Sequence, residues 1–230
     1  MKNICIFGDS VAKGVVFDET LNRYVFLKDC FANLFSEKEK VPVKNYAKFG
    51  CTVAKGAEMV RRHEQELSGY DFTVLEFGGN DCDMNWAEIA ADPKKDHQPN
   101  MPAKEFEENY DLMVSQIKQN GGRPIILSLP PLDARRFFDW VSKGLDRINI
   151  LNFLGGDVEY IYRWHEMYNG ALYRIASKHD VPVIDIREAF LKDKNYGRLL
   201  CADGMHPNAA GHDLILSTIK KYISTFKTAS

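Results

Sequence analysis

The chain has 230 residues, of which 45% are hydrophobic and 27% charged, a composition that is typical of globular proteins and excludes a disordered or fibrous one. Its 30 Lys and Arg residues nearly balance 32 Asp and Glu residues, giving a formal charge of -2, so we expect no nucleic-acid-binding surface. Because no apolar run approaches the roughly 20 residues of a membrane helix and no secretory signal precedes Gly8, we expect a cytoplasmic protein without an integral membrane segment.

The first predicted strand, residues 4–7, ends in the turn Gly8-Asp9-Ser10. A serine hydroxyl acts as a nucleophile where a rigid turn exposes it to a base. A strand-to-helix turn opened by glycine provides such a position. It also directs the backbone N–H of Ser10 and the dipole of the following helix toward a developing oxyanion. A serine that only caps the helix fits the same residues.

Four more β-prone runs alternate with helical patterns along the chain, at residues 43–46, 72–77, 124–129 and 181–184. Parallel neighbours in a sheet need crossover connections, which helices usually provide. The alternation therefore predicts an α/β protein with a five-stranded parallel sheet and helices on both faces. In such sheets the loops after the carboxyl ends of the strands form the binding crevice.

Two of these loops carry glycines. Gly50 follows the second strand, and Gly78-Gly79-Asn80-Asp81 follows the third. Glycine lets the backbone approach a ligand closely, and an asparagine amide can donate a hydrogen bond to an oxyanion. Ordinary turn formation explains either loop equally well.

Asp203 and His206 lie three residues apart, just before the last predicted helix. This spacing lets a carboxylate reach Nδ1 of the imidazole while Nε2 points outward, as a general base requires. The following Pro207 suits the first turn of a helix and would hold the histidine at a rigid position. A turn-capping aspartate beside a surface histidine also fits the isolated pattern.

Two segments, residues 82–103 and 131–160, are longer than a crossover needs, and both follow strand ends. We expect them to be insert loops over the site in a single domain spanning residues 1–230, since no linker or repeat is present. Aromatic side chains in these inserts either stack on a sugar ring, line an acyl pocket or are buried. These candidates are Trp86, Phe137, Phe138 and Trp140.

Asp9 and Asp81, beside the glycine-containing loops, are further candidate substrate contacts. Asp81 and Asp83 could also form a carboxylate pair for acid-base work on a sugar, although a role in the turns is favoured for both. The remaining histidines have no neighbours at metal-ligand spacing, so we expect neither a metal nor another cofactor. The five cysteines are odd in number and contain no C-x-x-C pair, which favours reduced thiols.

Together the four motifs, G-D-S, a glycine, G-x-N-D and D-x-x-H, resemble the SGNH or GDSL hydrolase family. The resemblance implies a three-layer α/β/α sandwich with flavodoxin-like strand order and a metal-free Ser–His–Asp triad. It assigns Ser10 as nucleophile and first oxyanion donor, Gly50 as second donor and Asn80 as third, with His206 as base and Asp203 orienting it.

The expected activity is hydrolysis of carboxylic esters of short acyl groups, with acetylated sugars or oligosaccharides among the expected small-molecule substrates. One alternative is hydrolysis of acyl thioesters or lysophospholipids. Another, of a different class, is a carbohydrate-binding module that has kept the crevice without catalysis.

Overall fold

The central sheet of the molecule is fully parallel. In the computed structural model, which describes residues 3–228, residues 1–2 and 229–230 of the predicted domain lie outside the described residues. The five strands are β1 (Ile4–Gly8), β4 (Val43–Asn45), β5 (Phe72–Glu76), β6 (Pro124–Leu127) and β7 (Val183–Ile184). They lie in the order β4-β1-β5-β6-β7. Counted along the chain this is the flavodoxin-like order 2-1-3-4-5, so the predicted fold class is confirmed.

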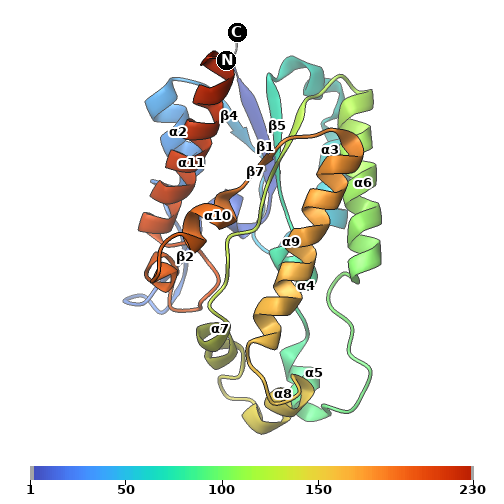
Figure 1. The fold of residues 1–230 in the computed structure, drawn as a ribbon, viewed down its shortest axis with the longest axis vertical. Coiled ribbons are helices and arrows are strands. Elements are labelled where there is room, and N and C mark those ends of the chain that lie inside the picture. Colours follow the sequence, from blue (N-terminus) through green and yellow to red (C-terminus); the bar gives the residue numbers. More distant parts are fainter. Residues whose placement is uncertain (1–2, 229–230) are drawn as a thin grey trace.

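Helices cover both faces of the sheet, as Figure 1 shows. Helices α2 (Phe31–Glu39) and α11 (Ala209–Thr228) lie on one face; α3 (Val53–Arg62), α6 (Ala103–Gln119) and α9 (Tyr160–His179) lie on the other. Each helix turns an apolar stripe toward the sheet, because apolar residues recur at a spacing of three or four. In α6 this stripe consists of Phe106, Tyr110, Met113, Val114 and Ile117, all buried.

The chain after β1 differs from the expectation. Helix α1 (Ser10–Lys13) is only four residues long and is followed by an antiparallel hairpin of β2 (Val15–Asp18) and β3 (Arg23–Phe26). Gly14 ends α1 with φ +78°, and a Cβ there would lie 2.4 Å from Cys30 Cβ, so only glycine fits this turn. With so short a helix, the predicted dipole adds little to the local N–H groups.

The two inserts carry short helices between irregular segments. They contain α5 (Trp86–Ala91), α7 (Ala134–Val141) and α8 (Arg147–Phe153), and Figure 1 places these helices beyond the sheet, at the end where β1 and β5 lead. Their apolar side chains form a separate hydrophobic cluster, which we call the insert layer. Its fully or nearly buried members include Ile89, Leu132, Ala134, Phe137, Phe138, Ile150 and Leu154.

The remaining helices are short and connect these layers. They are α4 (Gly79–Cys82), α10 (Ile186–Leu191) and the 3₁₀ helices Glu64–Gly69 and Tyr196–Leu199. Helix α4 follows β5, whereas the second 3₁₀ helix leads into the loop that carries Asp203 and His206. The connections thus hold the predicted motifs at one edge of the sheet.

Candidate active site

Ser10, His206 and Asp203 form one hydrogen-bonded chain. Ser10 Oγ lies 2.9 Å from His206 Nε2, and His206 Nδ1 lies 2.6 Å from Asp203 Oδ2. An ionised carboxylate only accepts hydrogen bonds, so Nδ1 carries the hydrogen and Nε2 accepts the hydrogen bond that the serine hydroxyl donates. The fold therefore brings together groups that are 196 residues apart in the sequence.

Backbone hydrogen bonds fix the carboxylate of this chain. Asp203 Oδ1 accepts from the N–H groups of Met205, at 2.9 Å, and of His206, at 3.0 Å. Burial by itself would raise the pKa of the Asp203 carboxyl, but the hydrogen bonds and charge of His206 and these backbone donors outweigh it. The pKa is lowered from its ordinary value. Asp203 is therefore ionised at neutral pH and holds one tautomer of the imidazole.

The three expected oxyanion donors line the same pocket as Ser10 Oγ and His206. The backbone N–H groups of Ser10 and Gly50 have no hydrogen-bond partner among the described residues. Gly50 has φ +68°, which favours glycine, and a Cβ there would meet nothing within 4 Å. Asn80 Nδ2 donates to Asp9 Oδ2 at 3.0 Å, which orients the amide and leaves its second N–H for a ligand.

Two buried carboxyl groups lie directly behind the serine. Asp9 and Glu76 are 2% and 1% exposed, and the two carboxyl groups lie close enough that each influences the ionisation of the other. Burial raises the pKa of both groups, and the charge of Asp9 raises that of Glu76 further. Because Asp9 also accepts from Val11 N–H and Glu76 from Ala12 N–H, the pair supports the turn that carries Ser10.

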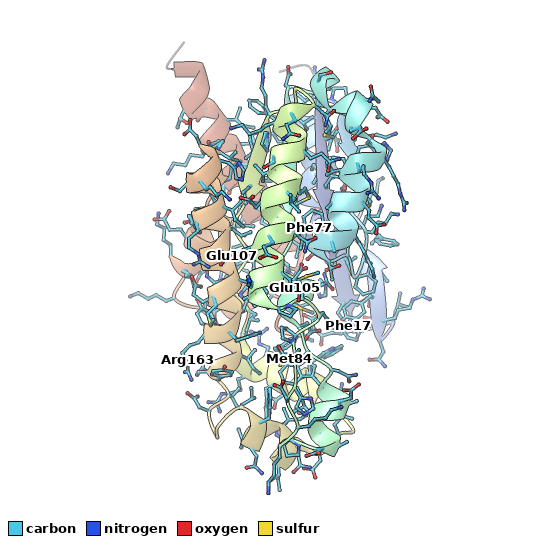
Figure 2. All side chains as sticks on the ribbon, turned by 90° about the vertical axis from the view of Figure 1, so that its right-hand side faces the viewer. Phe17, Phe77, Met84, Glu105, Glu107 and Arg163 are labelled. Atoms are coloured by element: carbon cyan, nitrogen blue, oxygen red, sulfur yellow. The ribbon has the colours of Figure 1, made fainter. Side chains whose placement is uncertain are left out.

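Two adjoining cavities meet at this site. The first has about 760 Å³ of space that is partly open to solvent, and we call it the catalytic pocket after the predicted roles of Ser10 and His206, which line it. The second, the insert cavity, has about 490 Å³ of such space and lies against the insert layer. Figure 2 places one of its lining residues, Met84, where the sheet-bearing body meets the insert helices. Its walls are mainly apolar side chains, including Trp86, Phe137, Phe153, Leu154, Ile161 and Trp164.

Residues 6–214 match the family model of the GDSL-like Lipase/Acylhydrolase family. The chain belongs to this family. It is therefore a GDSL hydrolase of the lipase and esterase type, as the motifs predicted. No curated protein matches the sequence at a significant level.

Solved structures share the fold of this GDSL hydrolase at low sequence identity. A lipase/acylhydrolase from Enterococcus faecalis superposes with a TM-score of 0.66 and 21% identity, over 97% of this chain and 95% of its own. The psychrotrophic esterase EstA from a Pseudoalteromonas species gives 0.64 and 13%, over 99% and 100%. Phospholipase A1 from Streptomyces albidoflavus gives 0.64 and 17%, over 96% and 98%. These similarities concern the fold alone.

The hairpin of this GDSL hydrolase contributes a residue that the sequence analysis did not single out. Tyr24, on β3, donates its hydroxyl hydrogen to Asp203 Oδ2 at 3.2 Å, and its ring centroid lies 5.2 Å from that of His206. The aromatic and β-branched residues of Tyr24-Val25-Phe26 are typical of a strand and could have predicted β3. Nothing local, however, indicated that the hairpin folds over Asp203.

Tyr24→Phe is expected to lower kcat by about tenfold, with a smaller effect on KM. The hydroxyl donates to a charged acceptor, a bond worth about 1.5–3 kcal/mol, and part of it acts as the imidazolium develops. Steady-state ester hydrolysis measures the effect. Tyr46→Phe, which removes a hydroxyl bonded to Glu66, is the control, and equal kcat values in the two variants would contradict this role for Tyr24.

The predicted substrate contacts divide into two groups. Asp9 lines the catalytic pocket, and Trp86 and Phe137 line the insert cavity. The other three line neither cavity. Asp81 is fully buried and accepts from Val53 N–H, Phe138 is buried in the insert layer against Arg147, and Trp140 packs on Phe17 of the hairpin.

Asp81→Asn is expected to remove a pH-dependent loss of stability. Burial raises the pKa of Asp81 from the ordinary 3.8 to about 7, although the hydrogen bond from Val53 N–H opposes the rise. Above pH 3.8 the unfolded chain releases this proton while the folded chain keeps it, so stability is full below that pH and falls until about pH 7. This difference in the pKa of Asp81 between the unfolded and folded chains corresponds to about 4 kcal/mol in the free energy of unfolding.

Urea unfolding from pH 4 to pH 8 tests this. The decline in the free energy of unfolding should be steeper in the natural protein than in Asp81→Asn, whose oxygen still accepts from Val53 N–H. Asp213→Asn, on an exposed part of α11, is the control. Parallel curves for the natural protein and Asp81→Asn would contradict the prediction.

A metal site and a membrane-spanning helix each require particular features of the described residues. Among residues 3–228, no three His, Cys, Asp or Glu side chains are grouped so that they could hold a metal ion. No described helix combines the length and apolar character needed to cross a bilayer. All five cysteines are buried and free of disulfide bonds.

Proposed function

We propose that this GDSL hydrolase cleaves carboxylic esters with Ser10 as nucleophile, His206 as general base and Asp203 as the orienting carboxylate. The observation that carries the proposal is the unbroken hydrogen-bonded chain from the hydroxyl through the imidazole to the ionised carboxylate. A base within hydrogen-bond reach activates a serine, and a carboxylate on the other ring nitrogen stabilises the imidazolium that forms.

In the proposed reaction, His206 Nε2 takes the hydroxyl proton as Ser10 Oγ attacks the ester carbonyl carbon. The carbonyl oxygen becomes negative and accepts from the N–H groups of Ser10 and Gly50 and from the amide of Asn80. His206 then gives its proton to the departing alcohol. Water, deprotonated by His206, then attacks the acyl carbon, the bond from that carbon to Ser10 Oγ breaks as His206 returns the proton to Oγ, and the carboxylic acid is released.

Two candidate substrate classes differ in the length of the acyl group. Short acyl esters, including acetylated sugars, need only the catalytic pocket. The apolar insert cavity supports a second candidate, the hydrolysis of longer acyl esters, acyl thioesters or lysophospholipids, because an alkyl chain would be the natural occupant of such walls. The names of two structural neighbours, a lipase/acylhydrolase and a phospholipase A1, agree with that candidate.

A series of p-nitrophenyl esters from acetyl to palmitoyl tests both candidates. We expect kcat/KM to rise from acetyl toward medium chains, since each methylene placed in the insert cavity contributes about 0.8 kcal/mol. Activity confined to acetyl esters would instead favour the short-acyl candidate, and the same series run on acyl thioesters would separate esterase from thioesterase activity.

Covalent labelling tests the catalytic proposal itself. One solved structure of the Pseudoalteromonas esterase is described as inhibited by monoethylphosphonate. A fluorophosphonate should therefore add one phosphonyl group at Ser10 of this chain, detectable in the intact mass and by peptide mapping. An unlabelled Ser10 together with inactivity on every ester would favour the non-catalytic binding module.

A further inference from the structure

Two polar side chains lie at the junction of the catalytic pocket and the insert cavity. Of the residues that line both, Gly79, Leu132 and Met205 are apolar, whereas Asp83 and His165 carry hydrogen-bonding groups. In a mainly apolar cavity a few polar groups fix the orientation of the ligand. Asp83 and His165 therefore determine which polar group a ligand can carry where the two cavities meet.

Arg187 fixes the tautomer of His165. Arg187 Nη1 lies 3.4 Å from His165 Nδ1, and because a guanidinium only donates, Nδ1 must accept and Nε2 must carry the hydrogen. The guanidinium is itself 4% exposed and held in place, by an ion pair with Glu166 at 2.6 Å and by bonds to the carbonyl groups of Leu129 and Pro130.

The imidazole of His165 is also neutral. Burial and the neighbouring charge of Arg187 lower the pKa of His165 to about 3. The Nε2 atom of His165 has no hydrogen-bond partner among the described residues. Because it is not fully enclosed by protein atoms either, a ligand in the cavity can reach it. His165 thus presents a neutral N–H donor of fixed tautomer at the junction, and with a pKa of about 3 its imidazole stays in that neutral form across the pH range of catalysis.

Asp83 supplies an acceptor at the same junction. Its Oδ1 accepts from Trp86 Nε1 at 2.8 Å, which fixes the carboxyl group at the start of the insert. A carboxylate has about four acceptor sites, so this bond leaves capacity for a ligand. The junction therefore combines one donor with one acceptor between a reactive serine and an apolar cavity.

A hydroxyl group is a small neutral group that both accepts and donates hydrogen bonds. An ether or ketone would serve only His165, and a plain alkyl chain would serve neither residue. Binding a ligand that leaves the donor of His165 or the acceptor of Asp83 without a hydrogen-bond partner costs about 1–3 kcal/mol. We propose that the insert cavity binds an alkyl chain that bears a hydroxyl group close to the ester. This inference rests on the ester hydrolysis proposed above.

The hydroxyl belongs either to the acyl half of the ester, as in a 3-hydroxyacyl group, or to the alcohol half, as in a monoester of a 1,2-diol. Two substrate pairs distinguish these sources: p-nitrophenyl 3-hydroxyoctanoate against octanoate, and 2-hydroxyoctyl acetate against octyl acetate. The hydroxylated member of one pair should have the higher kcat/KM, by about 10- to 100-fold. Equal values within both pairs would overturn the inference.

Variants of His165 test the origin of the preference. In His165→Phe, which removes the donor, the preference should fall to less than about threefold. His165→Gln, whose amide can accept from Arg187 and donate to the ligand, should retain most of it. The control His63→Phe, far from both cavities, should keep the full preference. A preference that survives His165→Phe would refute the assignment.

Two further measurements do not depend on turnover. Nitrogen-15 NMR of the imidazoles should show His165 protonated at Nε2 alone from pH 5 to pH 9, and a different tautomer or a titration there would contradict the donor role. Calorimetry on Ser10→Ala should show tighter binding of 3-hydroxyoctanoate or 1,2-octanediol than of octanoate or 1-octanol. If Ser10 stays unlabelled and every ester is inert, ester hydrolysis is refuted, while this binding comparison still tests the subsite.

Discussion

Ser10→Ala should lose ester hydrolysis by a factor of about 10⁴–10⁶ in kcat. The substitution removes the attacking oxygen and leaves His206 Nε2 without the hydrogen bond it accepts at 2.9 Å. It should not disturb the fold, because alanine is well tolerated at the start of α1. Hydrolysis of p-nitrophenyl butyrate measures the loss, and unchanged thermal unfolding verifies the fold.

A matched substitution sharpens this test. Ser217→Ala removes a hydroxyl on α11 that bonds only the carbonyl group of Leu214, and it should keep full activity and full labelling. His206→Ala should cost about as much as Ser10→Ala, and the double variant no more than either, since groups that act as a unit are not additive. Ser10→Ala with more than a few per cent of the natural kcat would refute the proposed nucleophile.

Asn80→Ala should lower kcat by about 10²–10³ with little change in KM, because an oxyanion donor acts mainly in the transition state. The substitution also removes the Asn80 amide that donates to Asp9 Oδ2 at 3.0 Å, so we expect some decrease in the stability of the fold as well. Steady-state kinetics on one ester, at a temperature where both proteins are folded, separates the two effects.

Asn109→Ala is the control for this substitution. Its amide donates to the carbonyl group of Glu105 within α6, away from the catalytic pocket. We expect its kcat to stay within about twofold of the natural protein, as for most surface changes. Equal kcat values for Asn80→Ala and Asn109→Ala would remove Asn80 from the proposed oxyanion hole.

The sequence alone determined the framework and the location of the site. The apolar runs ending near Gly8, Asn45 and Glu76 are local signals, and their alternation with helices allows a parallel sheet and little else. In a parallel sheet the carboxyl ends of the strands meet at one edge, so motifs that follow strands are brought together whatever their separation in sequence. This is why Ser10 and Asn80 could be placed at one site before any coordinates.

Only the tertiary structure decided what surrounds that site. Tyr24 reaches Asp203 because a hairpin follows a four-residue helix, and the turn between them needs glycine at position 14, where Cys30 leaves no room for a Cβ. His165 is one of many polar residues along α9, and its pattern gives no sign of a binding role. Its position depends on how α7 of the insert layer packs on α9 and on the buried Arg187, a contact between α9 and α10. Such long-range packing leaves no periodic trace in the sequence, because periodicity records which face is buried and not which partner covers it.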